Sequence, residues 1–219
     1  RYCLFYSMNN NSDKVYTIKM TRAIEDNVFF TGVTIFEMME TAGQVIAEEI
    51  ENYFNSKYLK DIVFLVGFGN NGGDGLVAAR YLLEKEYNCK IVVVGNKTTF
   101  NSLASQENYN KLKAVLPIEN WYQIREISDI ERIFVEIGKE NLLIDCIFGI
   151  GIQGSLREPY YSLIDFINQE YKGGIISVDL PSGYEPKVEN EMFIKNPKKI
   201  ICLVRNKIEA KIFSETEIV

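Results

Sequence analysis

Apolar runs alternate with helical repeats along most of this chain. Five short apolar runs predict strands, over residues 61–67, 90–95, 142–146, 174–179 and 199–204. Between them, apolar residues at helical spacing predict helices over residues 74–85, 101–115 and 158–170, and a shorter one near 129–137. The segment 121–127 is a candidate for a further short strand. This alternation is typical of βαβ units, in which helices cover both faces of a mostly parallel sheet.

Two helices are expected before the first strand, within residues 17–54. The second begins at Thr34 and Glu37, whose types and spacing form a capping box. Residues 1–16 are expected to be an extended or poorly ordered segment. Because no linker, repeat or low-complexity tract divides the chain, we predict one domain over residues 1–219.

Composition argues against several classes of function. The chain has 219 residues and a net charge of −6, which disfavours nucleic acid and membrane surfaces as partners. No apolar run approaches the roughly 18 residues of a membrane span. The four cysteines are scattered without a C-x-x-C pair, which favours buried thiols in a reducing compartment, cytoplasmic or, in a eukaryote, mitochondrial. Because the first residue is Arg1 and no signal peptide follows, we expect a fragment or a processed product.

Histidine is absent from the sequence. A Ser-His-Asp triad, a Cys-His dyad and a histidine-ligated metal are therefore excluded. Any chemistry must use carboxylates, Lys, Tyr, Cys, backbone amides or cations bound by oxygen atoms.

A glycine-rich loop, Gly67–Gly75, follows the first predicted strand and leads into a helix. Such strand–loop–helix units bind phosphate-bearing ligands in α/β proteins. The loop satisfies G-x-G-x-x-G, but the next strand ends in Asn96 and Lys97 rather than in the acidic residue of a standard dinucleotide site. A standard dehydrogenase is therefore disfavoured, and a Walker loop is excluded because no Lys-Ser or Lys-Thr follows the loop.

Polar side chains follow three of the predicted strands. Asn71 and Asp74 come after the first, Asp145 ends the strand at 142–146, and Asp179 ends the next. Because the carboxyl ends of parallel strands share one edge of a sheet, we expect these side chains to converge on a ligand site. Two of them have a structural alternative, Asp74 as the N-cap of a helix that begins near Gly75 and Asp179 as the anchor of a turn.

Four segments carry motifs in a fixed order, namely Met39–Gly43, Gly67–Gly75, Asp145–Pro159 and Asp179–Gly183. Together they resemble the motifs of the NAD(P)H-hydrate (NAD(P)HX) epimerase family. Thr41 stands where that family usually has Asn, and beyond Ser182 the resemblance decreases, since residues 198–204 replace the strand usual in the family.

The resemblance implies a three-layer α/β/α Rossmann-like domain that forms a homodimer. It implies an isomerase that interconverts the R and S epimers of hydrated NADH and NADPH, so that a dehydratase specific for the S form can restore the cofactor.

The resemblance also implies roles for individual residues. It assigns a potassium ion to Asn71, Asp145 and Ser182. It assigns contacts with the hydrated dinucleotide to Asn70, Asn71, Gly72, Gly73, Asp74, Gly149, Ile150, Gly151, Ile152, Gln153, Gly154, Ser155, Tyr160 and Asp179. Asp179 is our candidate for the catalytic acid–base group, because the chemistry needs a carboxyl group rather than a strong nucleophile.

Three alternatives remain open. The same fold serves as a non-catalytic binding module in mRNA-decapping scaffolds, although the intact Asn-Asn-Gly-Gly-Asp sequence favours an enzyme. The family also has a lipoprotein-binding role, which sequence does not test. A third alternative is the front half of a bifunctional protein with a dehydratase domain behind it.

Overall fold

The computed structural model describes residues 32–54, 61–149, 154–184, 192–203 and 216–219. Within them, seven strands form one parallel sheet in the order β3-β2-β1-β4-β5-β6-β7. The strands are β1 (Ile62–Val66), β2 (Cys89–Val94), β3 (Trp121–Ile124), β4 (Leu142–Cys146), β5 (Ile175–Val178), β6 (Lys199–Ile201) and β7 (Glu217–Ile218).

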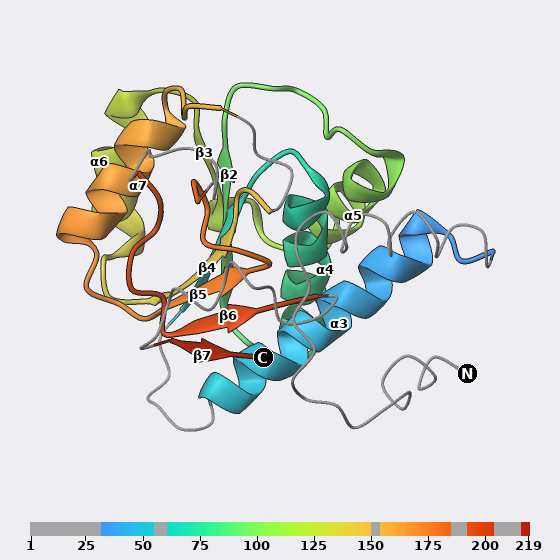
Figure 1. The fold of residues 1–219 in the computed structure, drawn as a ribbon. Helices are drawn as coiled ribbons and strands as arrows, with labels where there is room; N and C mark the ends of the chain where they lie inside the picture. The colour runs from blue at the N-terminus through green and yellow to red at the C-terminus, as the bar shows by residue number, and fades with distance from the viewer. Residues whose placement is uncertain (1–31, 55–60, 150–153, 185–191, 204–215) are drawn as a thin grey trace.

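Five α-helices in the described residues cover the two faces of this sheet (Figure 1). They are α3 (Ile35–Phe54), α4 (Asn70–Glu84), α5 (Leu103–Lys113), α6 (Ile127–Ile137) and α7 (Tyr160–Glu170), with a short 3₁₀ helix, η1 (Ile118–Asn120), before β3. The predicted α/β class and parallel sheet are thereby confirmed.

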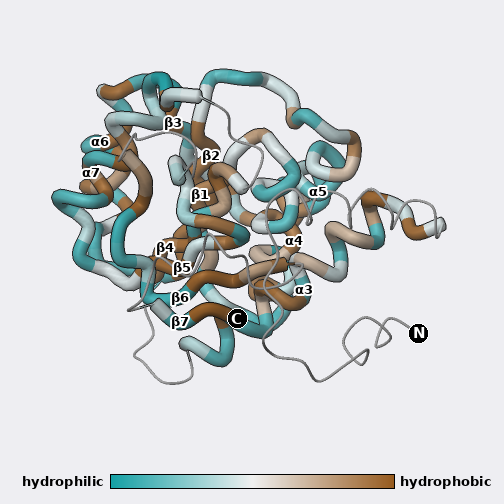
Figure 2. The backbone as a smooth tube through the Cα atoms, in the orientation of Figure 1, coloured by the Kyte–Doolittle hydropathy of each residue, from teal (hydrophilic) through white to brown (hydrophobic). Residues whose placement is uncertain are grey.

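Alternate residues of the strands pack into two separate cores. Phe64 of β1 packs with Leu76 of α4 in a core shared with α3 and α5, whereas its neighbour Leu65 packs with Phe134 of α6 in a core shared with α7. Every residue of β1 is buried, and the strands run through the apolar centre of the molecule (Figure 2). This is the continuous apolar pattern of a strand covered on both faces, and it produces the three predicted layers.

The beginning of α4 differs from the prediction. The sequence predicts a helix from residue 74, but α4 begins four residues earlier, with Gly69 as its N-cap. Asp74 is therefore not the N-cap, and that interpretation was wrong. The early turn exists because Gly72 and Gly73 fit where side chains do not: a Cβ at Gly72 would lie 1.9 Å from the Gly67 carbonyl oxygen. Helix propensity alone disfavours glycine within a helix, so the close packing at Gly72 and not propensity explains where α4 begins.

The ends of the described chain confirm some expectations and leave others untested. At the start of α3, the Glu37 amide donates to Thr34 Oγ1 at 3.2 Å and the Thr34 amide donates to Glu37 Oε2 at 2.9 Å, which is the predicted capping box. The helix expected before it and residues 1–16 lie outside the described residues. β7 was not predicted, because two residues at a sheet edge leave no apolar pattern.

Two further expectations were that the thiols are buried and that no segment spans a membrane. Cys89 and Cys146 are free thiols and both are buried, as predicted, whereas Cys202 is partly exposed. Among the described helices, none has the length and apolar character that crossing a membrane requires.

Candidate active site

The carboxyl ends of β1 and β4 mark the point where the strand order reverses. From β1 the chain moves outward through β2 and β3, and it returns to pair β4 with the other side of β1. In open α/β sheets, ligands bind at the carboxyl ends of strands at such a switch point. The segments that follow β1, β4 and β5 carry the three polar clusters predicted from the sequence.

Asp145 lies completely buried on β4, where it accepts four hydrogen bonds. Its Oδ2 accepts from the Ser177 hydroxyl at 2.9 Å and from the Ser182 amide at 2.8 Å. Its Oδ1 accepts from Ser182 Oγ at 2.5 Å and from the Ile147 amide at 3.4 Å. Burial nevertheless raises the pKa of Asp145 to about 6, because the cost of desolvating the carboxylate exceeds the effect of these donors.

Asn71 and Ser182 meet at the backbone carbonyl of Phe148. Asn71 Nδ2 donates to this oxygen at 2.9 Å and to the Val178 carbonyl at 3.3 Å. Ser182 Oγ lies 3.3 Å from the same Phe148 oxygen and accepts from the Phe148 amide at 2.9 Å. Since Ser182 also donates to Asp145, three residues from separate segments form one polar cluster.

The amide oxygen of Asn71 is buried and has no hydrogen-bond partner among the residues that the structure describes. An unsatisfied buried acceptor is costly. Rotating the amide by half a turn exchanges its oxygen and nitrogen, and Oδ1 then faces the carbonyls of Phe148 and Val178. Three oxygen atoms that face one another need a cation or a hydrogen-bond donor between them. The described residues hold no cluster of three or more His, Cys, Asp or Glu side chains, so amide, hydroxyl and carbonyl oxygens would supply most of the ligands of a cation here.

Asp179 follows β5 in an unusual backbone conformation, with φ of 73°. Few residues other than glycine adopt this region, and such strain collects at functional sites. The Asp179 amide donates to the Ile201 carbonyl at 2.8 Å, which helps to hold it there. Its side chain, 8% exposed, borders the loop after β4: a Cβ at Gly149 would lie 2.6 Å from Asp179 Oδ2.

Most glycines of the glycine-rich loop are required by packing. A Cβ at Gly67 would lie 2.0 Å from the Ile147 carbonyl oxygen, and one at Gly75 would lie 2.7 Å from Cys146 Sγ. A Cβ at Gly69, by contrast, meets nothing within 4 Å, and α4 has no side-chain cap. The N-terminus of α4 is thus the part of the loop that suits an anion.

The other predicted site residues differ in their surroundings. Asn70 is exposed, whereas Asp74 is 8% exposed on α4. Burial raises the pKa of the Cys146 thiol well above its usual value, and the charges of Asp145 and Asp74 add to this effect. Asp74 directly precedes Gly75, where a Cβ would lie 2.7 Å from Cys146 Sγ.

Tyr160 lies at the start of α7 and contacts the loop after β4. Its hydroxyl donates to the Val94 carbonyl at 3.2 Å, and its ring centroid is 4.8 Å from that of Phe148. Gly154 and Ser155 are exposed, while the predicted contacts 150–153 lie outside the described residues.

Two contributors were missed by the sequence analysis. Ser177 donates to Asp145 and is completely buried; its signal was a hydroxyl inside an apolar strand. The carbonyls of Phe148 and Val178 have no sequence signal, because every residue carries one.

A cavity of about 340 Å³ lies elsewhere, and none of the predicted site residues lines it. Its lining residues are Arg125, Glu126, Ile127, Ser128, Glu158 and Pro159.

Comparison with known proteins adds a second line of information. A family model described as the N-terminus of YjeF-related proteins matches residues 36–208. Proteins named NAD(P)H-hydrate epimerase from Paramecium tetraurelia and Nitrosopumilus maritimus are each 36% identical to this chain. The first match covers 83% of this chain and 72% of the relative, and the second covers 68% and 66%.

A longer relative is the bifunctional NAD(P)H-hydrate repair enzyme of Methanocaldococcus jannaschii, which is 31% identical over 91% of this chain. The chain spans only 40% of that relative's length. The crystal structure of the yeast protein ynu0 matches with a TM-score of 0.76 and 24% identity, covering 94% of this chain and 86% of that one. This likeness supports the fold.

Proposed function

Since the chain belongs to the family of YjeF-related protein N-termini, we propose that it is an NAD(P)H-hydrate epimerase. Its substrates are then NADHX and NADPHX, whose R and S forms it interconverts. The observation that supports this most is the cluster of Asn71, Asp145 and Ser182 at the switch point, with Asp179 alongside it on the same edge of the sheet.

The reaction suits a carboxyl group. In the hydrated ring, a hydroxyl and the ring nitrogen share carbon C6. A proton from Asp179 lets the hydroxyl leave as water while the nitrogen lone pair forms a planar iminium ion. Water then adds to C6 from either face, and its proton returns to the carboxylate. Atoms and charge balance, no redox partner is needed, and either epimer forms.

A potassium ion is the cation we propose for this site. Asn71, Asp145 and Ser182 would hold it, together with the carbonyls of Phe148 and Val178. The orphaned Asn71 oxygen supports this choice, as does the raised pKa of Asp145, whose charge the ion would offset. The ion supplies positive charge near the dinucleotide; Asp179 performs the proton transfers.

The dinucleotide is expected to lie across the switch point. Its diphosphate would face the amides at the start of α4, where Gly69 leaves open space. Asn70 to Asp74 would contact it from one side, and Gly149 to Ser155 with Tyr160 from the other. The nicotinamide end would then reach Asp179.

The remaining partners are proposed from the family. We expect a homodimer that works with an S-specific dehydratase, an activity suggested by the names of the bifunctional relatives. A non-catalytic scaffold role is less well supported, because it gives no reason for a strained acid beside a buried polar cluster.

The proposal is tested by incubating isolated R-NADPHX with the purified chain and following the C6 proton by NMR. The S signal should grow until the epimers reach equilibrium, at a rate proportional to protein concentration. A rate independent of protein would contradict the proposal.

A further inference from the structure

The beginning of α5 is bonded to the glycine-rich loop. The Asn101 amide donates to the Phe68 carbonyl at 2.8 Å, and Ser105 Oγ donates to the Gly69 carbonyl at 3.3 Å. The rings of Phe68 and Phe100 lie beside these bonds, with centroids 5.1 Å apart. α5 follows β2, whereas the loop follows β1, so these contacts join two separate units of the fold (Figure 1).

Ser105 is the centre of a short chain of hydroxyl groups. It is completely buried, and its Oγ lies 2.9 Å from Ser102 Oγ. Ser102 caps α5 by accepting from the Ser105 amide at 3.2 Å, which leaves its hydroxyl hydrogen free to point at Ser105. The Ser105 hydrogen then points at the Gly69 carbonyl.

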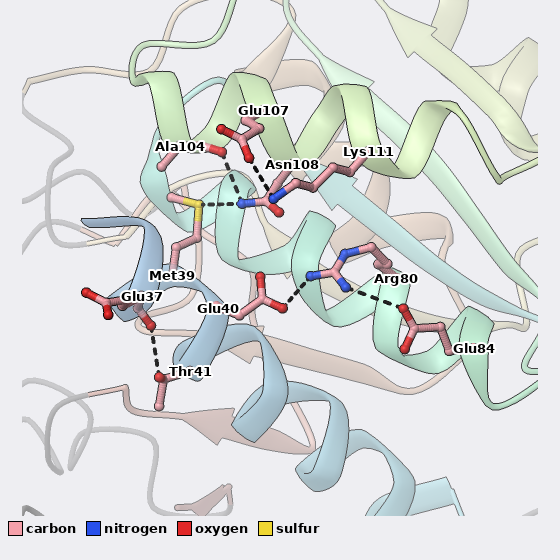
Figure 3. A network of polar contacts seen from close by, with 10 residues as sticks. All are labelled: Glu37, Met39, Glu40, Thr41, Arg80, Glu84, Ala104, Glu107, Asn108 and Lys111. Atoms are coloured by element: carbon pink, nitrogen blue, oxygen red, sulfur yellow. Dashed lines mark hydrogen bonds and ion pairs between the residues drawn. The ribbon is translucent and has the colours of Figure 1, made fainter. Parts of the chain in front are cut away.

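Side chains from α3 and α5 enclose the same turn of α4 (Figure 3). Asn108 Nδ2 donates to the Ala104 carbonyl at 3.0 Å and lies 3.5 Å from Met39 Sδ. A Cβ at Gly73 would lie 2.5 Å from Ser105 Oγ and 2.7 Å from Met39 Sδ. A side chain at position 73 would therefore have to displace Ser105 or Met39.

These bonds fix the direction of two backbone amides. In a trans peptide the carbonyl and the following N–H point in opposite directions. The carbonyls of Phe68 and Gly69 accept hydrogen bonds from the beginning of α5, and the Gly69 carbonyl also accepts from the Gly73 amide at 3.2 Å, the first helical bond of α4. The N–H groups of Gly69 and Asn70 therefore point away from these donors. They stand at the uncapped N-terminus of α4, where amide hydrogens attract an anion.

We propose that Ser105 is a positioning residue for the diphosphate of the substrate. Its hydroxyl holds the Gly69 carbonyl and thereby keeps the Asn70 N–H aimed at the phosphate oxygens before the ligand arrives. The identity of the ligand rests on the proposed function; the orientation of the amides does not. Binding energy that would otherwise be used to order the loop is then available for affinity.

The test compares Ser105→Ala with a matched control, Ser102→Ala. Both remove one hydroxyl from the same turn of α5. Ser102→Ala removes the helix cap and so lowers the melting temperature, but it leaves Ser105 bonded to Gly69. The stability of each variant is recorded first, by calorimetry. Comparison with Ser102→Ala thus separates the effect of lower stability from the effect of losing the bond that orients the Gly69 carbonyl.

The binding probe is ADP-ribose, which carries the diphosphate but no hydrated ring. It therefore reports binding without any reaction. Calorimetric titration should give a Kd about 5-fold higher for Ser105→Ala, the size of one lost hydrogen bond, and a Kd close to wild type for Ser102→Ala. With NADPHX, Ser105→Ala should raise KM by a similar factor and leave kcat unchanged, the pattern of lost uniform binding.

Equal affinities in Ser105→Ala and wild type would overturn the inference, as would a wild-type protein that does not bind ADP-ribose. A protein that binds ADP-ribose with the expected Ser105 dependence but does not epimerise NADPHX would contradict the proposed function alone.

Discussion

The carboxylate of Asp179 lies against Gly149, where a Cβ would be 2.6 Å from Oδ2. This contact joins the ends of β5 and β4. It places the proposed acid–base group beside the segment expected to bind the substrate, Gly149 to Ser155. A glycine at position 149 leaves the carboxylate the space it occupies.

Gly149→Ala should therefore displace the Asp179 carboxylate. A shift of 1 Å in a reacting group can cost about 10²-fold in rate, so we expect a fall in kcat of that order in the NADPHX assay. Gly69→Ala is the matched control for kcat, because its Cβ meets nothing within 4 Å among the described residues. It lies at the proposed diphosphate site, so it should raise KM and leave the proton-transfer step intact. An unchanged kcat in Gly149→Ala would show that this contact does not position the acid.

Asp179→Asn keeps the shape of the side chain and removes its titratable carboxyl group. General acid–base catalysis contributes about 10²–10⁴-fold, so kcat should fall by this order while ADP-ribose binds as before. Asp74→Asn provides the comparison: this residue lies within α4, and its loss should weaken binding and stability first. A fully active Asp179→Asn variant would assign the proton transfer to another group.

The buried carboxylate of Asp145 makes stability depend on pH and on potassium. Its pKa rises from 3.8 to about 6 on folding, so between these values the folded protein binds the proton more tightly than the unfolded chain. Stability from this group is complete below about pH 4 and falls as pH rises to about 6, by about 3 kcal/mol in total. A bound cation compensates the carboxylate, so potassium should raise the melting temperature at about pH 7.5 and much less at about pH 5.

Scanning calorimetry in potassium chloride and in choline chloride of equal ionic strength measures this effect. Asp145→Asn should remove most of both the pH dependence and the potassium dependence. Identical melting temperatures in the two salts at neutral pH would argue against a potassium site.

The sequence was sufficient for β1 and β4 because each lies in a largely apolar run. β4 coincides with the predicted 142–146, and β1 differs by one residue at each end. The start of α4 was misplaced because Asn and Gly have low helix propensity, and only contacts with Gly67, Met39 and Ser105 explain why a helix forms there.

The site was partly predictable for a similar reason. Side chains at strand ends converge by topology, so the closeness of Asn71 and Asp145 followed from their positions, whereas Ser182 was assigned by the family resemblance. The carbonyls that complete the cluster and the bond from Ser105 to Gly69 depend on tertiary packing. Residues on α5 gave no sign of their contact with the loop, because their spacing only indicates a helix.

The central claim is that this chain interconverts the epimers of the hydrated cofactor, and a coupled assay tests it most directly. A mixture of R- and S-NADPHX is treated with an excess of an S-specific dehydratase, and NADPH is followed by absorbance. With the wild-type chain present, conversion should run to completion at a rate set by its concentration. With Asp179→Asn, the S form should be consumed at once and the remaining R form should be converted slowly. If the R form persists and disappears only at the spontaneous rate when the wild-type chain is added, the account is contradicted.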